Sequence, residues 1–392
     1  MPRTAKVFAP DVSCRLSRRQ FVRAAAAASL VAGWCGRLRA APAAHIEEVR
    51  TISLASYYHG WPTVARRNDG TLLLVYSGGR EAHVCPFGRV ELMRSYDEGR
   101  TWTWPQVLLD SPIDDRDAGI CITAKGTLLV TTFTSLAYVS QLEKASGWPE
   151  EKLQRWLLAH RRVGDSERQA ELATWMIRSE DGGLTWSARY ACPVNSPHGP
   201  VTLRDGRILY AGKDLWGGSH RVGVCQSIDD GKSWQWLAEL PVRKGDDRRD
   251  YHELHLVETE SGKLIIHIRN HNRQNEREIL QSESTDGGKT WSEPHPIGVW
   301  GLPSHLLRLA DGRLLMSYGY RRPPYGVQVR ISEDEGAHWS EPIVLSDDGT
   351  SGDLGYPSTV ECGGGRLVTV WYELRSGSPY AVLRQATWKL VS

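Results

Sequence analysis

At six places in this sequence a pair of residues stands immediately before a short apolar segment, and most of these pairs contain a side chain that can transfer protons. The six pairs at this position are Trp61-Pro62, Arg116-Asp117, His198-Gly199, His252-Glu253, Ser304-His305 and Tyr356-Pro357. Carboxylates, imidazoles and a phenol can take up or release protons, and a guanidinium can hold an anionic group. If the six segments converge in the fold, these side chains predict a catalytic or binding site.

A second polar set follows the next apolar segment of each unit. Its members are Arg80, Glu81 and His83; Lys213 and Asp214; Arg269 and His271; Tyr318, Tyr320, Arg321 and Arg322; and Glu373 and Arg375. A purely structural centre would carry small or apolar residues at such positions. Both sets therefore predict one rim rich in Arg, His, Tyr and carboxylates.

Two interlocking repeats define the elements that must position these residues. The first repeat reads Ser-x-Asp-x-Gly-x-(Thr/Ser)-Trp at Ser95–Trp102, Ser179–Trp186, Ser227–Trp234 and Ser284–Trp291, with a divergent copy at Ser332–Trp339. In such a turn the Ser and Asp side chains bond backbone amides, Gly takes a positive φ, and Trp covers the hairpin. We expect these boxes to be structural and assign them no chemistry.

The second repeat is a turn followed by an apolar strand, and it occurs six times. Its turns lie at residues 68–71, 125–127, 205–207, 261–263, 311–313 and 364–366. Each copy predicts a hairpin between the first two strands of a four-stranded sheet. The prediction is an all-β fold, a six-bladed β-propeller over residues 44–392, with residues 46–55 supplying the outer strand that closes the last blade.

Two segments depart from this pattern. Residues 138–172, in the second unit, are charged and Leu-rich, and they predict one or two helices inserted in blade two, as a substrate lid or as a packing or partner surface. Residues 1–43 contain Ser17-Arg18-Arg19-Gln20-Phe21-Val22, then an Ala-rich apolar run, then Ala41-Pro42-Ala43. This order resembles a twin-arginine signal peptide, which implies a periplasmic or secreted protein.

The boxes, the six hairpins and several rim residues resemble the sialidase (neuraminidase) superfamily of BNR, or Asp-box, repeat proteins, as a divergent member. The resemblance covers residues 46–390. It implies a Tyr nucleophile at Tyr356, a Glu partner at Glu253 that takes its proton, and a carboxylate-binding arginine at Arg269. Glu373 resembles an acid that orients an arginine.

Three positions depart from that family. Gly60-Trp61-Pro62 stands where the family has Arg-Ile-Pro, so one clamp arginine is missing. His83 stands in the stretch where the family carries its acid/base Asp. The third arginine is ambiguous among Arg321, Arg322 and Arg330.

The leading hypothesis is an exported glycoside hydrolase that removes a terminal, acidic sugar from a glycan. Tyr356 would attack with Glu253 as its base, His83 or Asp117 would protonate the leaving oxygen, and Arg80, Arg269 and Arg321 would hold the sugar. His198, His252, His305 and Glu373 complete the expected binding set.

Two alternatives stay open. The first is a polysaccharide lyase or uronate-processing enzyme that uses His, Tyr and Arg, which the five rim histidines favour: His83, His198, His252, His255 and His305. The second is a carbohydrate-binding propeller without catalysis.

Composition excludes other classes of function. The chain has 48 Lys and Arg against 46 Asp and Glu, a net charge of +2, and it lacks the excess of basic residues that is typical of nucleic-acid-binding proteins. No further segment is apolar and long enough to span a membrane. No His or Cys spacing predicts a metal site, no cofactor is expected, and the oligomeric state is open.

Overall fold

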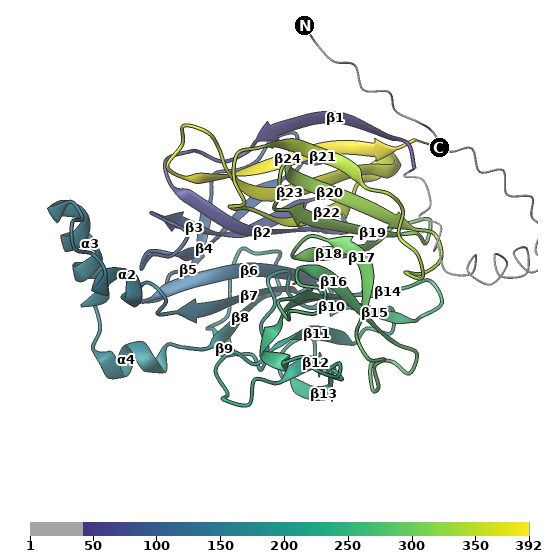
Figure 1. Cartoon of the computed structure of the whole chain (residues 1–392), viewed down its shortest axis with the longest axis horizontal. Coiled ribbons are helices and arrows are strands. Elements are labelled where there is room, and N and C mark those ends of the chain that lie inside the picture. The colour runs from purple at the N-terminus through teal and green to yellow at the C-terminus, as the bar shows by residue number, and fades with distance from the viewer. Residues whose placement is uncertain (1–41, 392) are drawn as a thin grey trace, which may run out of the picture. The chain divides into compact units, whose positions relative to one another are not determined.

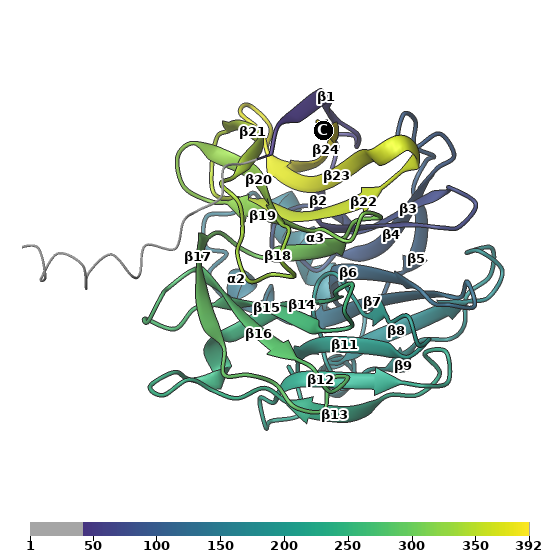
Figure 2. The same cartoon turned by 90° about the vertical axis from the view of Figure 1, so that its right-hand side faces the viewer.

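The computed structural model describes residues 42–391, and these form six antiparallel four-stranded sheets, the blades of a propeller (Figures 1 and 2). The blade number and the all-β class predicted from the repeats are thus confirmed. Strands of the first three blades, innermost first, are β2 (Tyr58–Arg66), β3 (Leu72–Arg80), β4 (Arg89–Ser95) and β5 (Gln106–Leu109); β6 (Asp114–Ile122), β7 (Leu128–Ser135), β8 (Thr174–Ser179) and β9 (Tyr190–Ala191); β10 (Val201–Thr202), β11 (Ile208–Lys213), β12 (Val222–Ser227) and β13 (Gln235–Glu239). Those of the last three are β14 (Tyr251–Glu258), β15 (Leu264–Asn270), β16 (Glu278–Ser284) and β17 (His295–Trp300); β18 (Ser304–Arg308), β19 (Leu314–Tyr320), β20 (Tyr325–Ser332) and β21 (Ile343–Gly349); β22 (Leu354–Glu361), β23 (Arg366–Leu374), β24 (Ala381–Leu390) and β1 (Ala44–Thr51).

Strand β1 closes the ring, as the sequence predicts. It pairs antiparallel with β24, from Ala44 opposite Leu390 to Thr51 opposite Arg384, although it precedes β24 by more than three hundred residues (Figure 1). The two ends of the described chain therefore share one blade. This pairing ties the first and last strands of the described residues into one sheet and so closes the ring of blades.

The Asp boxes act as turns between the third and fourth strands of the first five blades. In each box the Gly amide donates a hydrogen bond to the Ser hydroxyl four residues earlier, at 2.8–3.0 Å. The Asp carboxylate accepts from the backbone amide four residues later. These hydrogen bonds within each turn confirm the structural role predicted for the boxes.

The inserted segment lies in blade two, between β7 and β8, and forms three short helices rather than one or two: α2 (Val139–Glu143), α3 (Glu150–His160) and α4 (Asp165–Ala170). Trp156 of α3 is buried, and its Nε1 donates to Glu81 Oε2 at 2.9 Å. Arg155 donates to the other oxygen of Glu81. The helices are thus attached to the loop that follows β3 in blade one.

The segment assigned to a signal peptide lies almost wholly outside the described residues. Within residues 42–391, no helix has the length and apolarity needed to cross a membrane.

Candidate active site

Four residues at the predicted convergence position share an unusual backbone conformation. Trp61, Asp117, Glu253 and Tyr356 have φ values of 53°, 48°, 42° and 53°, on the innermost strands of blades one, two, four and six. Each lies where the pairing register of its strand shifts, so each is part of a β-bulge. Left-handed φ is costly for such side chains and marks functional sites. The bulges aim these four side chains toward the propeller axis.

Tyr356 and Glu253 form the centre of the site. The Tyr356 hydroxyl donates to Glu253 Oε1 at 2.5 Å, and Arg269 Nη1 donates to Glu253 Oε2 at 2.5 Å and to the Tyr356 oxygen at 3.1 Å. Glu253 and Arg269 come from blade four, and Tyr356 comes from blade six, more than eighty residues further along the chain. The structure brings together the pair and the arginine that the family resemblance implies.

The ionisation of this group follows from burial and charge. Burial, followed by the negative charge of Glu253, raises the pKa of Tyr356 far above its ordinary value, so the phenol is neutral. Burial alone would raise the pKa of Glu253, but the charge of Arg269 and hydrogen bonds from Arg269 and Tyr356 outweigh it and lower that pKa. Glu253 is therefore an ionised acceptor facing a protonated phenol.

Asp117 has the opposite character. It is buried, and burial together with the nearby charge of Glu253 raises its pKa to about 7. The pKa values of the two carboxyl groups are thus shifted in opposite directions, raised for Asp117 and lowered for Glu253. This separation is typical of an acid and a base that act on the same substrate.

Arg321 lies beside Tyr356. Its guanidinium carbon lies 5.5 Å from the Tyr356 ring centroid, and its Nε donates to the Leu354 carbonyl at 2.7 Å. Its Nη2 is buried without a hydrogen-bond partner among the described residues. Gly355 has φ of 125°, and a Cβ at this position would lie 3.3 Å from that nitrogen. The absence of a side chain therefore makes room for the Arg321 guanidinium. An unsatisfied buried cation donor favours an anionic ligand.

A small cavity opens beside Asp117 and Glu253. It has a volume of about 230 Å³ and is lined by Asp117, Phe133, Asn195, Lys213, Leu215, Trp216, His252 and Glu253. His252 thus borders the site, and burial lowers its pKa to about 4, which leaves the ring neutral. Burial also lowers the pKa of Lys213, whose ammonium donates to the Arg249 carbonyl.

His83 lies on the other side of Trp61. Its Nδ1 lies 2.8 Å from the Tyr58 hydroxyl and 3.0 Å from Asp353 Oδ1, and its ring packs edge-on to Trp61 at 5.1 Å. About half of the His83 side chain is exposed, so it is accessible to a ligand. Its proximity to Asp353 and Tyr58 was not predicted.

Arg80 does not lie where a sugar could reach it. Its side chain is fully buried, and its two terminal nitrogens donate to Asp114 at 2.6 and 2.9 Å. It packs 4.8 Å from the Trp61 ring, which Arg116 covers at 4.4 Å. Arg80 therefore supports the bulge at Trp61, and Arg116, whose side chain is 11% exposed, is the more accessible of the two cations.

Three of the rim histidines lie together on the axis beneath Tyr356. His198, His255 and His305 are buried, with ring centroids 4.5–5.3 Å apart, and His198 lies 6.5 Å from Tyr356. Burial, followed by the charge of a neighbouring histidine, lowers all three pKa values far below the ordinary range. His198 and His305 thus pack against each other instead of facing a ligand. In the described residues no cluster of His, Cys, Asp or Glu has the arrangement needed to bind a metal.

Glu373 is also buried away from the cavity. Its carboxylate accepts from Trp371 Nε1, Arg375 and Arg384 at 3.0 Å each. It orients arginines, as the resemblance implies, but they are not Arg269 or Arg321, and it does not reach a sugar.

Sequence reasoning did not single out Asp353, Tyr58, Phe133, Asn195 and Trp216. Asp353 lies three residues before Tyr356, so proximity to a bulge residue was the available signal. Phe133 lies near the end of β7, and neither repeat in the sequence marks its position.

Comparison with known proteins agrees with this fold. The BNR repeat-like domain family matches residues 147–369, more than half of the chain. A sialidase of Bacteroides fragilis (strain YCH46) is 26% identical over 327 residues, which is 74% of this chain and 56% of that protein. A sialidase of Clostridium perfringens is 22% identical, over 74% of this chain and 62% of its own length. The chain thus spans little more than half the length of these relatives.

Solved structures show the same propeller. A protein of unknown function from Dyadobacter fermentans DSM 18053 superposes with a TM-score of 0.74 at 22% identity, over 89% of this chain and all of that one. The NanB sialidase from Streptococcus pneumoniae gives a TM-score of 0.63 at 13% identity, over 88% of this chain and 70% of its own. On the match across residues 147–369, together with the boxes and the six blades, the chain belongs to the BNR repeat-like domain family, as a divergent member of the sialidase superfamily.

Proposed function

We propose that the protein is a retaining exo-glycosidase that releases a terminal, acidic sugar from a glycan, with Tyr356 as nucleophile. The observation that carries this proposal is the buried, short hydrogen bond from the Tyr356 hydroxyl to Glu253, with Arg269 bonded to both residues. A carboxylate held ionised beside a neutral phenol is a base positioned to take the phenolic proton.

The proposed reaction has two steps. In the first, the Tyr356 oxygen bonds to the anomeric carbon, Glu253 takes the phenolic proton, and the bond to the leaving oxygen breaks while Asp117 protonates that oxygen. In the second, Asp117 removes a proton from water, the water oxygen bonds to the anomeric carbon, and the tyrosyl bond breaks with return of the proton from Glu253. Two displacements retain the anomeric configuration.

An acidic sugar fits the charges around the nucleophile. Arg321 has an unpartnered buried nitrogen near the Tyr356 ring, and the Arg116 guanidinium lies 4.4 Å from the Trp61 ring. A neutral phenol attacks such a sugar without the charge repulsion that a carboxylate nucleophile would meet. The small cavity of about 230 Å³ suits a single terminal residue rather than the interior of a polymer.

The lyase alternative loses the feature that favoured it. Of the five rim histidines, His198, His255 and His305 are buried against one another and are kept neutral. We therefore rank elimination below hydrolysis and keep it as an outcome of the test.

The test is a set of sialosides and uronic-acid glycans, with released sugar and ultraviolet absorbance followed together. We expect released sialic acid, lost in Tyr356→Phe and retained in Tyr251→Phe. The control is matched because the Tyr251 hydroxyl also donates to a carboxylate, Asp246, at 2.7 Å. A 2,3-difluoro sialic acid should label the Tyr356 peptide, seen as a mass increase. Unsaturated product would establish a lyase, and binding without turnover would establish a binding propeller.

We further propose that residues 1–43 direct export through the twin-arginine route to the periplasm or beyond, and that residues 44–392 form the mature domain. The arginine pair, apolar run and Ala41-Pro42-Ala43 support this proposal. Cell fractionation with Arg18→Lys/Arg19→Lys tests it, since loss of both arginines should leave the protein in the cytoplasm.

A further inference from the structure

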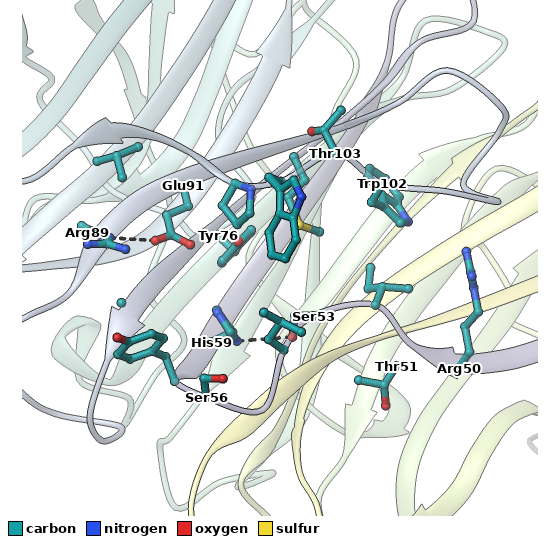
Figure 3. Close-up of a pocket in the computed structure, with 18 residues that line it drawn as sticks. Arg50, Thr51, Ser53, Ser56, His59, Tyr76, Arg89, Glu91, Trp102 and Thr103 are labelled. Atoms are coloured by element: carbon teal, nitrogen blue, oxygen red, sulfur yellow. Dashed lines mark hydrogen bonds and ion pairs between the residues drawn. The ribbon is translucent and has the colours of Figure 1, made fainter.

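A second and larger cavity lies outside the axis site, against the face of blade one (Figure 3). Its volume is about 670 Å³, within the range of roughly 300–1,000 Å³ that is usual for small-ligand pockets. It is bordered by the connection from β1 to β2, by β3 and β4, and by the residues that follow the first Asp box. No residue lines both this cavity and the one beside Asp117, so the two are separate.

The floor of the cavity is polar and held in place. Glu91 is almost fully buried, and Arg89 Nε donates to its Oε1 at 2.7 Å (Figure 3). Its other oxygen lies over Gly78, where a Cβ would stand only 2.3 Å away, so the glycine leaves the carboxylate its space. Tyr76 completes this side of the floor. A buried carboxylate with one oxygen outside the ion pair is a strong acceptor for hydroxyl donors.

His59 adds a second polar group to the floor. Its Nδ1 lies 3.3 Å from the Ser53 hydroxyl, and its Nε2 has no hydrogen-bond partner in residues 42–391. Burial lowers the pKa of His59 to about 4, so the ring is neutral and can exchange a hydrogen bond with a hydroxyl. The neighbouring Tyr58 faces the axis site instead, since successive side chains on a strand alternate.

The rim of the cavity is aromatic and exposed. Trp104 is 79% exposed and Tyr57 is 52% exposed, although both line the cavity. Other tryptophans of the outer strands are engaged: Trp102 Nε1 donates to Gln385, and Trp236 is covered by Arg221 at 3.9 Å. No such ring or cation partner is found for Trp104 among the described residues. Large exposed aromatic rings beside a polar pocket indicate a binding surface.

We propose that this cavity is a second glycan-binding site, which takes one or two neutral pyranose units. The apolar C–H face of a pyranose packs on an aromatic ring such as Trp104, while its hydroxyls donate to Glu91 and bond to His59. A neutral sugar fits because both arginines of the lining are already paired, Arg89 with Glu91 and Arg50 with Glu48 at 3.4 Å. We assign this site binding and no catalysis, because no second carboxyl group accompanies Glu91 among the lining residues.

The test is titration calorimetry of the purified protein with lactose, N-acetyllactosamine, cellotriose, xylotriose and maltotriose. At least one of these should bind, and Trp104→Ala should weaken that binding tenfold or more. Tyr96→Ala is the matched control, because Tyr96 is 73% exposed in the first Asp box but does not line the cavity. Glu91→Gln, which keeps the shape, should weaken binding severalfold.

Two results would overturn the proposal. The first is that none of the five oligosaccharides binds; the second is that binding is as strong in Trp104→Ala as in Tyr96→Ala. Because the two cavities share no lining residue, binding of the neutral sugar should persist in Tyr356→Phe. Loss of hydrolysis without loss of neutral-sugar binding separates the two sites, and neutral-sugar binding without any hydrolysis would leave only the second site supported.

Discussion

Replacing Asp117 by Asn tests the assignment of acid and base most directly. Asn has nearly the same shape and cannot donate the proton that the leaving oxygen needs. Loss of a general acid costs about 10²–10⁴-fold in rate. The loss of kcat/KM, which reports the first step, should be large for a natural disaccharide linkage and small for a nitrophenyl glycoside, because a nitrophenolate leaves without protonation.

The same variant changes the pH dependence in a direction that the structure determines. Asp117 must be protonated to act, and its pKa is raised to about 7, so kcat/KM of the native protein should fall as pH rises through about 7. In Asp117→Asn this alkaline limb should disappear. Asp115→Asn is the control, because burial also raises the pKa of Asp115 to about 7 but its carboxylate accepts from the Ser111 amide, outside the site.

The stability of the native protein should fall over a similar pH range. A carboxyl whose pKa is 3.8 when unfolded and about 7 when folded binds its proton more tightly in the native state, so stability falls as pH rises between about 4 and 7. That difference corresponds to roughly 4 kcal/mol. Asp117→Asn should therefore be more stable than the native protein at pH 8, by up to about 4 kcal/mol, and not at pH 4.

Urea unfolding at both pH values, with rate profiles on both substrates, completes the experiment. The reasoning is refuted if the pH profile of Asp117→Asn keeps its alkaline limb. It is also refuted if the substitution lowers kcat/KM as much for the nitrophenyl substrate as for the disaccharide. In that case His83, which also borders the site, becomes the acid.

Three further outcomes are expected. Glu253→Gln should lower kcat about 10²–10⁴-fold, because it removes the base but keeps a partner for the Tyr356 hydroxyl; an unchanged rate would exclude Glu253 as the base. Arg321→Ala should lower kcat/KM for an acidic glycoside roughly 10- to 150-fold, since a hydrogen bond to a charged group contributes about 1.5–3 kcal/mol, and an equal loss on a neutral glycoside would contradict the anion-binding role. Arg80→Ala should destabilise the fold by about 3–5 kcal/mol in chemical denaturation, because it leaves Asp114 buried without its cation, and full stability would show that the pair is dispensable.

The sequence by itself determined the architecture. Asp boxes and glycine turns are local motifs whose hydrogen bonds form within a few residues, so their spacing predicted the strand order, the six blades and the closing role of the first strand. The same spacing located Tyr356, Glu253 and Asp117, because every innermost strand begins at the same place in its repeat.

Only the tertiary structure decided which polar residues of the rim are available to a ligand. Arg80 and Glu373 occupy positions like those of Arg269 and Arg321, but neighbouring strands bury them against Asp114 and Arg384. Such partners come from other blades or from distant parts of one blade, and no local pattern encodes them. Burial also set the raised pKa of Asp117, because removal of water around a carboxyl depends on what the whole ring packs around it.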